Sequence, residues 1–249
     1  MEWIAVAVIG LAVGFLGGLF GKGGSALATP LLAAIGIPPA LAIAAPLPAT
    51  IPSTLAASTA YAGRQLVDRD VVRWSIAIGL PATIAGALAS GRVDAGALVR
   101  ITDVLVTVVG LRILSSTSTS VDDAAAARPA GYRTRVVVVA AVVGLAAGLL
   151  ANSGGFLLAP LYLTVLRLPV KRALATSLLV SAALAVPGTI VHGALGHLDL
   201  RLVLVFAAAA VPLARLGANV AVRVDAHRLE RAYGAGLTVL GVAFLANWV

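Results

Sequence analysis

The sequence predicts an all-α polytopic membrane protein made of two inverted repeats, each with about five membrane segments, eight to ten in total. Of the 249 residues, 60% are hydrophobic and 11% are charged, whereas soluble domains are about 45–50% apolar. The apolar residues come in long runs, and a run of about 20 spans a bilayer. The chain also matches itself at a distance of roughly 130 residues.

The internal match is ungapped between residues 14–32 and 144–162, where seven of the 19 positions are identical. After a slip of one residue it resumes, with Asp68 on Asp199 and Gly86 on Gly217. Duplicated units in apolar chains are typical of membrane transporters, which hold their substrate where the two copies meet. The repeat therefore predicts a transporter.

Each copy divides into five apolar segments. The first copy (1–114) contains 3–21, 24–36, 40–63, 71–91 and 97–114, and the second (136–249) contains 136–151, 154–166, 173–195, 202–222 and 229–248. The linker 115–135 between the copies is polar, with helix-breaking Pro129 and Gly131. Because the N-terminus lacks the basic region and cleavage site of a signal peptide, we expect it to be a retained membrane segment.

Segment 24–36 is about 20 Å long as a helix, too short for a hydrocarbon core of about 30 Å. Segments 3–21 and 24–36 therefore form two tight spans or a re-entrant hairpin, and both options return the chain to its starting side. Each copy then crosses the membrane an odd number of times, so the second copy is inverted. If the two segments form a single crossing, the copies are parallel instead.

The Lys and Arg residues distinguish these arrangements. Inverted copies place 13 loop Lys and Arg residues on one side and three on the other, whereas parallel copies split them 8 and 8. The 13 are Arg64, Arg69, Arg73, Arg112, Arg128, Arg133, Arg135, Arg167, Lys171, Arg172, Arg223, Arg228 and Arg231. Cytoplasmic loops carry the excess of Lys and Arg. We therefore expect inverted copies, a cytoplasmic linker and both termini outside.

Composition also excludes several classes of protein. The chain has no cysteine, so disulfides and thiolate metal sites are excluded, and we expect no metal and no cofactor. A net charge of +8 would suggest a nucleic-acid partner in a soluble protein. Here the basic residues orient the loops instead, so no nucleic acid is expected.

The strongest local signal is a glycine break in each copy. The breaks are Lys22, Gly23, Gly24 and Ser25 in the first copy and Asn152, Ser153, Gly154 and Gly155 in the second. Glycines let the chain turn and leave backbone N–H groups without a helical partner. Such N–H groups form an anion site at the start of a half-helix. In an inverted repeat the two breaks can meet near the midplane. The alternative is close helix packing, the role we expect for Gly14, Gly18, Gly144 and Gly148.

Lys22 indicates an anionic substrate if the hairpin apex is deep, because a lysine at membrane depth costs at least ~2.5 kcal/mol and marks function. If both segments span, Lys22 lies at the cytoplasmic surface. Arg215, four residues before Asn219, offers a donor fork suited to sulfonate, carboxylate or phosphate. Asp103 can pair with Arg215 or carry a proton, and a structural ion pair explains both equally well. His192 can titrate during transport or cap a helix end.

Three prolines within seven residues, Pro46, Pro48 and Pro52, cannot leave an intact α-helix in segment 40–63. Nearby hydroxyls can repair the exposed carbonyls or coordinate a ligand. These hydroxyls belong to Thr50, Ser53 and Thr54, and to Thr176, Ser177 and Ser181 in the second copy.

The paired segments GFLGGLFGKGGSALATPLL (14–32) and GLAAGLLANSGGFLLAPLY (144–162) resemble the TauE/SafE family of sulfite and organosulfonate exporters. Residues 66–68 and 196–199 add to the resemblance, which covers the chain from Gly10 to Leu245. It implies a permease for sulfite, sulfoacetate, taurine or thiosulfate in the bacterial inner membrane. Lys22 departs from the family pattern, in which this position is usually apolar or small.

We therefore expect a secondary transporter in the bilayer that carries a small anion by alternating access, coupled to a proton or sodium ion. A homodimer is one arrangement open to it. A passive anion channel would use the same binding groups. An intramembrane serine protease would need Ser25 within hydrogen-bond reach of His192 or His197. Both histidines are expected near the outer face, so we expect no enzyme.

Overall fold

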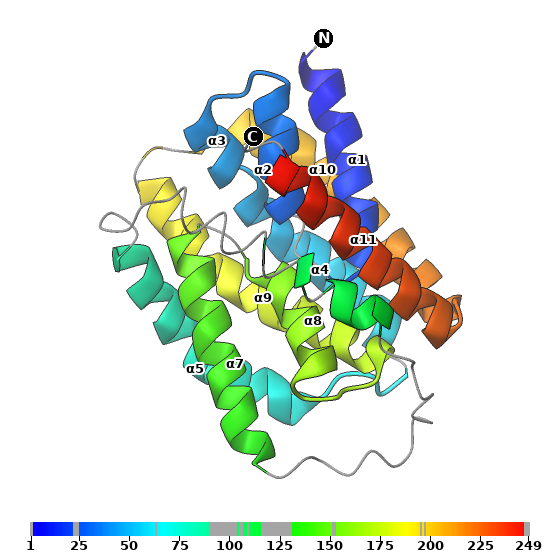
Figure 1. Cartoon of the computed structure of the whole chain (residues 1–249). Helices are drawn as coiled ribbons and strands as arrows, with labels where there is room; N and C mark the ends of the chain where they lie inside the picture. The colour runs from blue at the N-terminus through cyan, green and yellow to red at the C-terminus, as the bar shows by residue number, and fades with distance from the viewer. Residues whose placement is uncertain are drawn as a thin grey trace.

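The computed structural model describes residues 2–21, 25–62, 64–89, 104, 107–108, 110–115, 131–150, 153–194, 196 and 198–246, and its regular elements are helices (Figure 1). The first copy contains α1 (Glu2–Leu19), α2 (Ser25–Ala34), α3 (Pro39–Ala44), α4 (Pro46–Ala62) and α5 (Arg69–Ala89). The second contains α7 (Tyr132–Leu149), α8 (Gly155–Thr164), α9 (Val170–Ala194), α10 (Leu200–Arg223) and α11 (Ala226–Ala246). The described residues between 104 and 115 are also helical.

The described part of the chain has five helical spans that are long and apolar enough to cross a membrane. They are Leu41–Tyr61, Arg69–Ala89, Tyr132–Leu149, Val170–Ala194 and Leu200–Arg223. Large apolar side chains point outward from them: Leu88 is 78% exposed and Leu200 is 70% exposed. Extended apolar outer surface is typical of helices that face lipid. The all-α membrane architecture predicted from the sequence is confirmed.

Segment 40–63 is not one intact α-helix, as its prolines predict, and the interruption lies at Ala45 between α3 and α4. Pro46 begins α4 and Pro48 lies in its first turn, where the missing N–H has no partner within the helix. Pro52 alone lies inside α4. The prolines therefore divide the segment into two helices without destroying the longer one.

The glycine spacing that the two repeats share brings helices of different copies together. A Cβ atom on Gly14 of α1 would overlap the backbone of Ala210 of α10, and one on Gly144 of α7 would meet Gly79 of α5. The next turn repeats this arrangement with Gly18 against Ala214 and Gly148 against Thr83. Because these pairs align in the repeat, α1–α10 and α7–α5 are equivalent contacts. The expected packing role of these four glycines is confirmed.

Equivalent helices of the two copies also meet each other. Leu47, early in α4, lies 3.2 Å from the position of a Cβ on Gly188, late in α9. Ala57, late in α4, and Leu178, early in α9, line the same pocket. The two helices therefore run in opposite directions. Leu47 aligns with Leu178 and Ala57 with Gly188, so the two contacts are images of each other.

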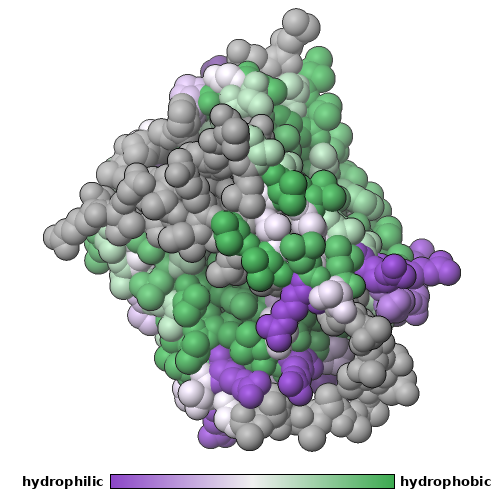
Figure 2. All heavy atoms as spheres, in the orientation of Figure 1, coloured by the Kyte–Doolittle hydropathy of each residue, from purple (hydrophilic) through white to green (hydrophobic). Residues whose placement is uncertain are grey.

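Hydrogen bonds tie the basic helix ends together at one end of the bundle. They run from Tyr132 Oη to Asp68 Oδ2 (3.5 Å), from the Asp68 N–H to Thr176 Oγ1 (3.1 Å), from Arg135 Nη1 to the Val165 carbonyl (3.2 Å) and from Lys171 Nζ to the Val222 carbonyl (3.0 Å). In the view of Figure 2, hydrophilic side chains lie in the lower part of the molecule, beneath an apolar middle. The helix ends near Asp68, Arg135, Lys171 and Val222 therefore lie at the same end of the bundle.

Helices α7 and α8 form a hairpin that returns to this end. The hydrogen bond from Arg135 joins the start of α7 to Val165, directly after α8. Gly154, between the two helices, lies against Leu184 near the middle of α9. Helix α8 has 10 residues and is about 15 Å long, too short to cross a core of about 30 Å. Helix α8 is therefore one of the shorter apolar helices that accompany the five long ones.

Candidate functional site

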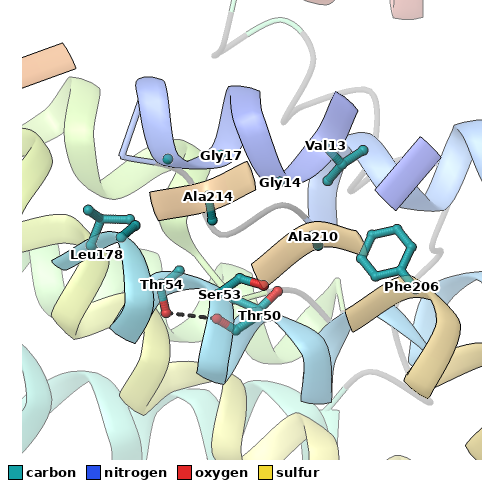
Figure 3. A pocket seen from close by; sticks show the side chains of 12 residues that line it. Val13, Gly14, Gly17, Thr50, Ser53, Thr54, Leu178, Phe206, Ala210 and Ala214 are labelled. Atoms are coloured by element: carbon teal, nitrogen blue, oxygen red, sulfur yellow. Dashed lines mark hydrogen bonds between the residues drawn. The ribbon is translucent and has the colours of Figure 1, made fainter. Parts of the chain in front are cut away.

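A small pocket lies at mid-helix between the two copies (Figure 3). We call it the α1–α4–α10 pocket. It is lined by Val13, Gly14, Gly17 and Gly18 of α1, Thr50, Ser53, Thr54 and Ala57 of α4, Leu178 of α9, and Phe206, Ala210 and Ala214 of α10. Helices of both repeats thus contribute walls, which is where the sequence placed the substrate.

Three buried hydroxyls form the polar wall of the pocket. Each hydroxyl donates to the carbonyl four residues earlier in α4. These bonds join Thr50 Oγ1 to Pro46 (2.9 Å), Ser53 Oγ to Ala49 (2.7 Å) and Thr54 Oγ1 to Thr50 (2.8 Å). Figure 3 shows Ser53 and Thr50 beside the α10 residues Ala210 and Phe206.

These hydrogen bonds test the backbone-repair alternative. The proline inside α4 is Pro52, and the carbonyl that its missing N–H leaves open is that of Pro48. None of the three hydroxyls donates to Pro48. The carbonyls that they do contact also accept the backbone N–H four residues on in an α-helix. The hydroxyls therefore make second bonds to satisfied carbonyls and can turn toward a ligand at small cost.

The rest of the lining is apolar, with glycines and alanines beside the larger Val13, Leu178 and Phe206. Among the described residues, no charged side chain lines the pocket. Gly14, Gly17 and Gly18 leave the backbone of α1 bare on one wall. A ligand in this site would meet hydroxyl groups on one side and peptide backbone on the other.

The glycine break of the second copy is buried. Ser153 is fully buried, and Gly154 takes a left-handed conformation with φ 69° immediately before α8. This conformation favours glycine, and Gly155 then opens the helix. In the first copy, Ser25 is the first residue of α2. Lys22, Gly23, Gly24 and Asn152 lie outside the described residues.

The remaining sequence-predicted residues lie apart from the pocket lining. Ser177 Oγ donates to the carbonyl of Gly21 (2.8 Å) and Thr176 accepts from Asp68, so both lie at the basic end of α9. Arg215 is exposed on α10, beside the lining residue Ala214 but outside the lining, and Asn219 is half-buried. The other two residues are the half-buried His192, in the last turn of α9, and Asp103, which lies outside the described residues.

Sequence reasoning missed the apolar side chains of the lining, namely Val13, Ala57, Leu178, Phe206, Ala210 and Ala214. A signal was present, because Phe206, Ala210 and Ala214 are spaced by four residues and occupy one helix face. The two alanines align with Gly79 and Thr83, which face the glycines of α7. Following this alignment would have identified the α10 wall.

Comparisons with known proteins agree over nearly the whole chain. A family model described as sulfite exporter TauE/SafE matches residues 6–244. Two curated proteins of Xylella fastidiosa, each named probable membrane transporter protein, are 29% identical to the chain. The protein from strain 9a5c aligns over 241 residues and that from strain Temecula1 / ATCC 700964 over 247, each match covering 95% of this chain and 91% of the relative. No solved structure matches the chain.

Proposed function

Because the chain belongs to the TauE/SafE family of membrane transporters, we propose that it is a secondary transporter of a small sulfur-containing anion such as sulfite or an organosulfonate. The chain is a multi-pass membrane transporter and not an enzyme, which removes the serine protease alternative. The observation that carries the proposal is the hydroxyl-lined α1–α4–α10 pocket between the repeats.

The hydroxyl groups of the pocket can donate hydrogen bonds to a small oxyanion that has shed its water. In this proposal Thr50, Ser53 and Thr54 turn their O–H groups from the α4 carbonyls to the anion oxygens. Hydrogen bonds to charged groups are worth about 1.5–3 kcal/mol each, so the exchange favours binding. The neutral lining makes the net charge of the bound anion costly, and a cation from the glycine break would offset it.

Lys22 is the cation that the sequence offers for this role. We expect Lys22→Ala to weaken sulfite transport in proteoliposomes without lowering the yield of folded protein. The reason is that the substitution removes a counter-charge and leaves the helix contacts of Gly14 and Gly18 in place. Lys22→Arg should keep most of the activity. Equal transport rates for Lys22→Ala and the wild-type protein would remove Lys22 from the site.

We further propose that the repeats are inverted and work by alternating access. Support comes from α4 and α9, which align in the repeat yet run in opposite directions, and from the equivalent contacts α1–α10 and α7–α5. An exchange of conformation between such copies moves access from one side of the membrane to the other. Asp103 and His192 are candidates for proton coupling.

Labelling of introduced cysteines tests this topology, since the chain has no cysteine of its own. We expect a cysteine at Arg69 or Ser118 to react with a membrane-impermeant maleimide from the cytoplasmic side only. A cysteine at Gly96 or Gly196 should react from the outside. If Ser118→Cys and Gly196→Cys react from the same side, the inverted arrangement is wrong.

A further inference from the structure

The repeat that builds the α1–α4–α10 pocket also gives each of its residues a counterpart in the other copy. The register of this counterpart is fixed independently of the pocket. Gly36 and Arg167 both have positive φ, 91° and 55°, and each stands two residues before a proline, Pro38 and Pro169. Counting on from these residues aligns α4 with α9 and α5 with α10.

In this register the polar wall is not repeated. Ser53 corresponds to Leu184 and Thr54 to Ala185, so two of the three hydroxyls are absent from the second copy. Thr50 corresponds to Ser181, which is fully buried and whose hydroxyl has no hydrogen-bond partner among the described residues. The second copy therefore keeps one hydroxyl of the three.

Leu184 occupies the space that corresponds, by the repeat, to the open pocket beside Ser53. Its side chain is 1% exposed and lies 3.0 Å from the position of a Cβ on Gly79, and 3.4 Å from that of a Cβ on Gly154. Gly79 is the counterpart of Ala210 in the pocket wall. Because Gly79 has no side chain, it leaves room for Leu184, and the smaller Ser53 leaves a pocket beside Ala210.

A buried hydrogen bond closes the other end of the counterpart space. Tyr162 Oη donates to Ser75 Oγ (2.7 Å), and both side chains are fully buried. Ser75 of α5 corresponds to Phe206 of α10, which lines the α1–α4–α10 pocket. The hydrogen bond pairs these two hydroxyls within the protein, so the tyrosine ring stays in place and Ser181 is left as the unpartnered hydroxyl among the described counterpart residues.

We infer that the substrate binds in the α1–α4–α10 pocket, formed by α1 and α4 of the first copy with α10 of the second, and that within the described residues Leu184 and Tyr162 close its repeat-related counterpart. This inference rests on the proposed function for its ligand, a small oxyanion. Binding is then asymmetric. Both copies change conformation during transport, and the first copy supplies the polar wall. Ser53 is the position at which the copies differ most in this respect.

The test introduces the packing of Leu184 against Gly79 at the equivalent positions of the pocket. The double variant Ser53→Leu with Ala210→Gly reproduces the pair Leu184 and Gly79, a packing that the protein already contains. Equilibrium binding of radiolabelled sulfite to purified protein in detergent should show one site per chain in the wild type. We expect the double variant to bind at least about 100-fold more weakly. Ser58→Leu, the same change five residues along α4 outside the pocket lining, should bind as the wild type does.

A cysteine pair tests the inference even if the double variant does not fold. Thr50→Cys and Ser181→Cys change equivalent positions and nearly conserve volume. A water-soluble methanethiosulfonate should modify the cysteine at position 50, more slowly in the presence of sulfoacetate, which does not react with the reagent, and leave the one at 181 unmodified. Reaction at both positions, two sulfite sites per chain, or wild-type binding by the double variant overturns the inference but not the transport function. Failure of the wild-type protein to bind or transport any tested sulfur anion refutes the proposed function itself.

Discussion

Replacing Gly18 or Gly148 by alanine should cost the folded protein about 1–3 kcal/mol, the usual range for overpacking a tight contact. A methyl group on Gly18 would overlap the carbonyl oxygen of Ala214, and one on Gly148 would overlap that of Thr83. Backbone cannot move aside as a side-chain end can, so α1 must separate from α10, or α7 from α5. Thermal unfolding in detergent, followed by size-exclusion chromatography, measures the loss.

Gly236→Ala is the matched control for this prediction. Gly236 also lies inside a helix, but its nearest neighbours are ring atoms of Phe20 at 3.6 Å and 3.7 Å from the Cβ position. That is ordinary contact, so alanine should be neutral or gain up to about 1 kcal/mol in helix propensity. Equal unfolding temperatures for Gly18→Ala, Gly148→Ala and Gly236→Ala would contradict the close helix contacts.

Removing two pocket hydroxyls without changing side-chain shape should lower sulfite transport about 10- to 100-fold per hydroxyl. The variant is Thr50→Val with Thr54→Val, in which a methyl group replaces each hydroxyl. Folding should be preserved, because both hydroxyls donate to carbonyls that α4 already satisfies. Initial rates of sulfite uptake into proteoliposomes, at several concentrations, separate a rise in KM from a fall in the maximal rate.

Thr59→Val provides the control for the hydroxyl effect. Thr59 Oγ1 makes the same kind of bond within α4, to the carbonyl of Ala56 (2.7 Å), but the residue is exposed. Its substitution should leave transport unchanged. If Thr50→Val with Thr54→Val transports sulfite as well as Thr59→Val does, the hydroxyls serve the helix and not the substrate.

Much of this fold could be predicted from the sequence, because membrane helices are recognised by their long apolar runs. Segments 71–91 and 202–222 correspond closely to α5 and α10. The aligned Asp68 and Asp199 accept hydrogen bonds from the first N–H groups of these helices, so their repetition has a capping role. The path of segment 40–63 was harder to predict, because a proline's effect depends on its place within the helix turn.

The site was only partly predictable. Thr50 and Ser53 were identified because hydroxyls in an apolar segment must bond to the backbone or to a ligand. Arg215 was grouped with them by charge alone, but position along the chain does not say which side of a helix a residue occupies. The structure places it on the exposed side of α10, one residue from Ala214 of the pocket lining. The difference between Ser53 and Leu184 gained meaning only once their surroundings were known.

Uptake of sulfur anions by liposomes that contain the purified protein tests the central claim most directly. The panel comprises sulfite, thiosulfate, sulfoacetate and taurine, with chloride and phosphate for comparison, each with and without a proton or sodium gradient. A secondary anion transporter predicts saturable uptake of at least one sulfur anion that follows the gradient. Uptake no greater than in empty liposomes, or uptake that rises linearly with concentration and ignores every gradient, would contradict it.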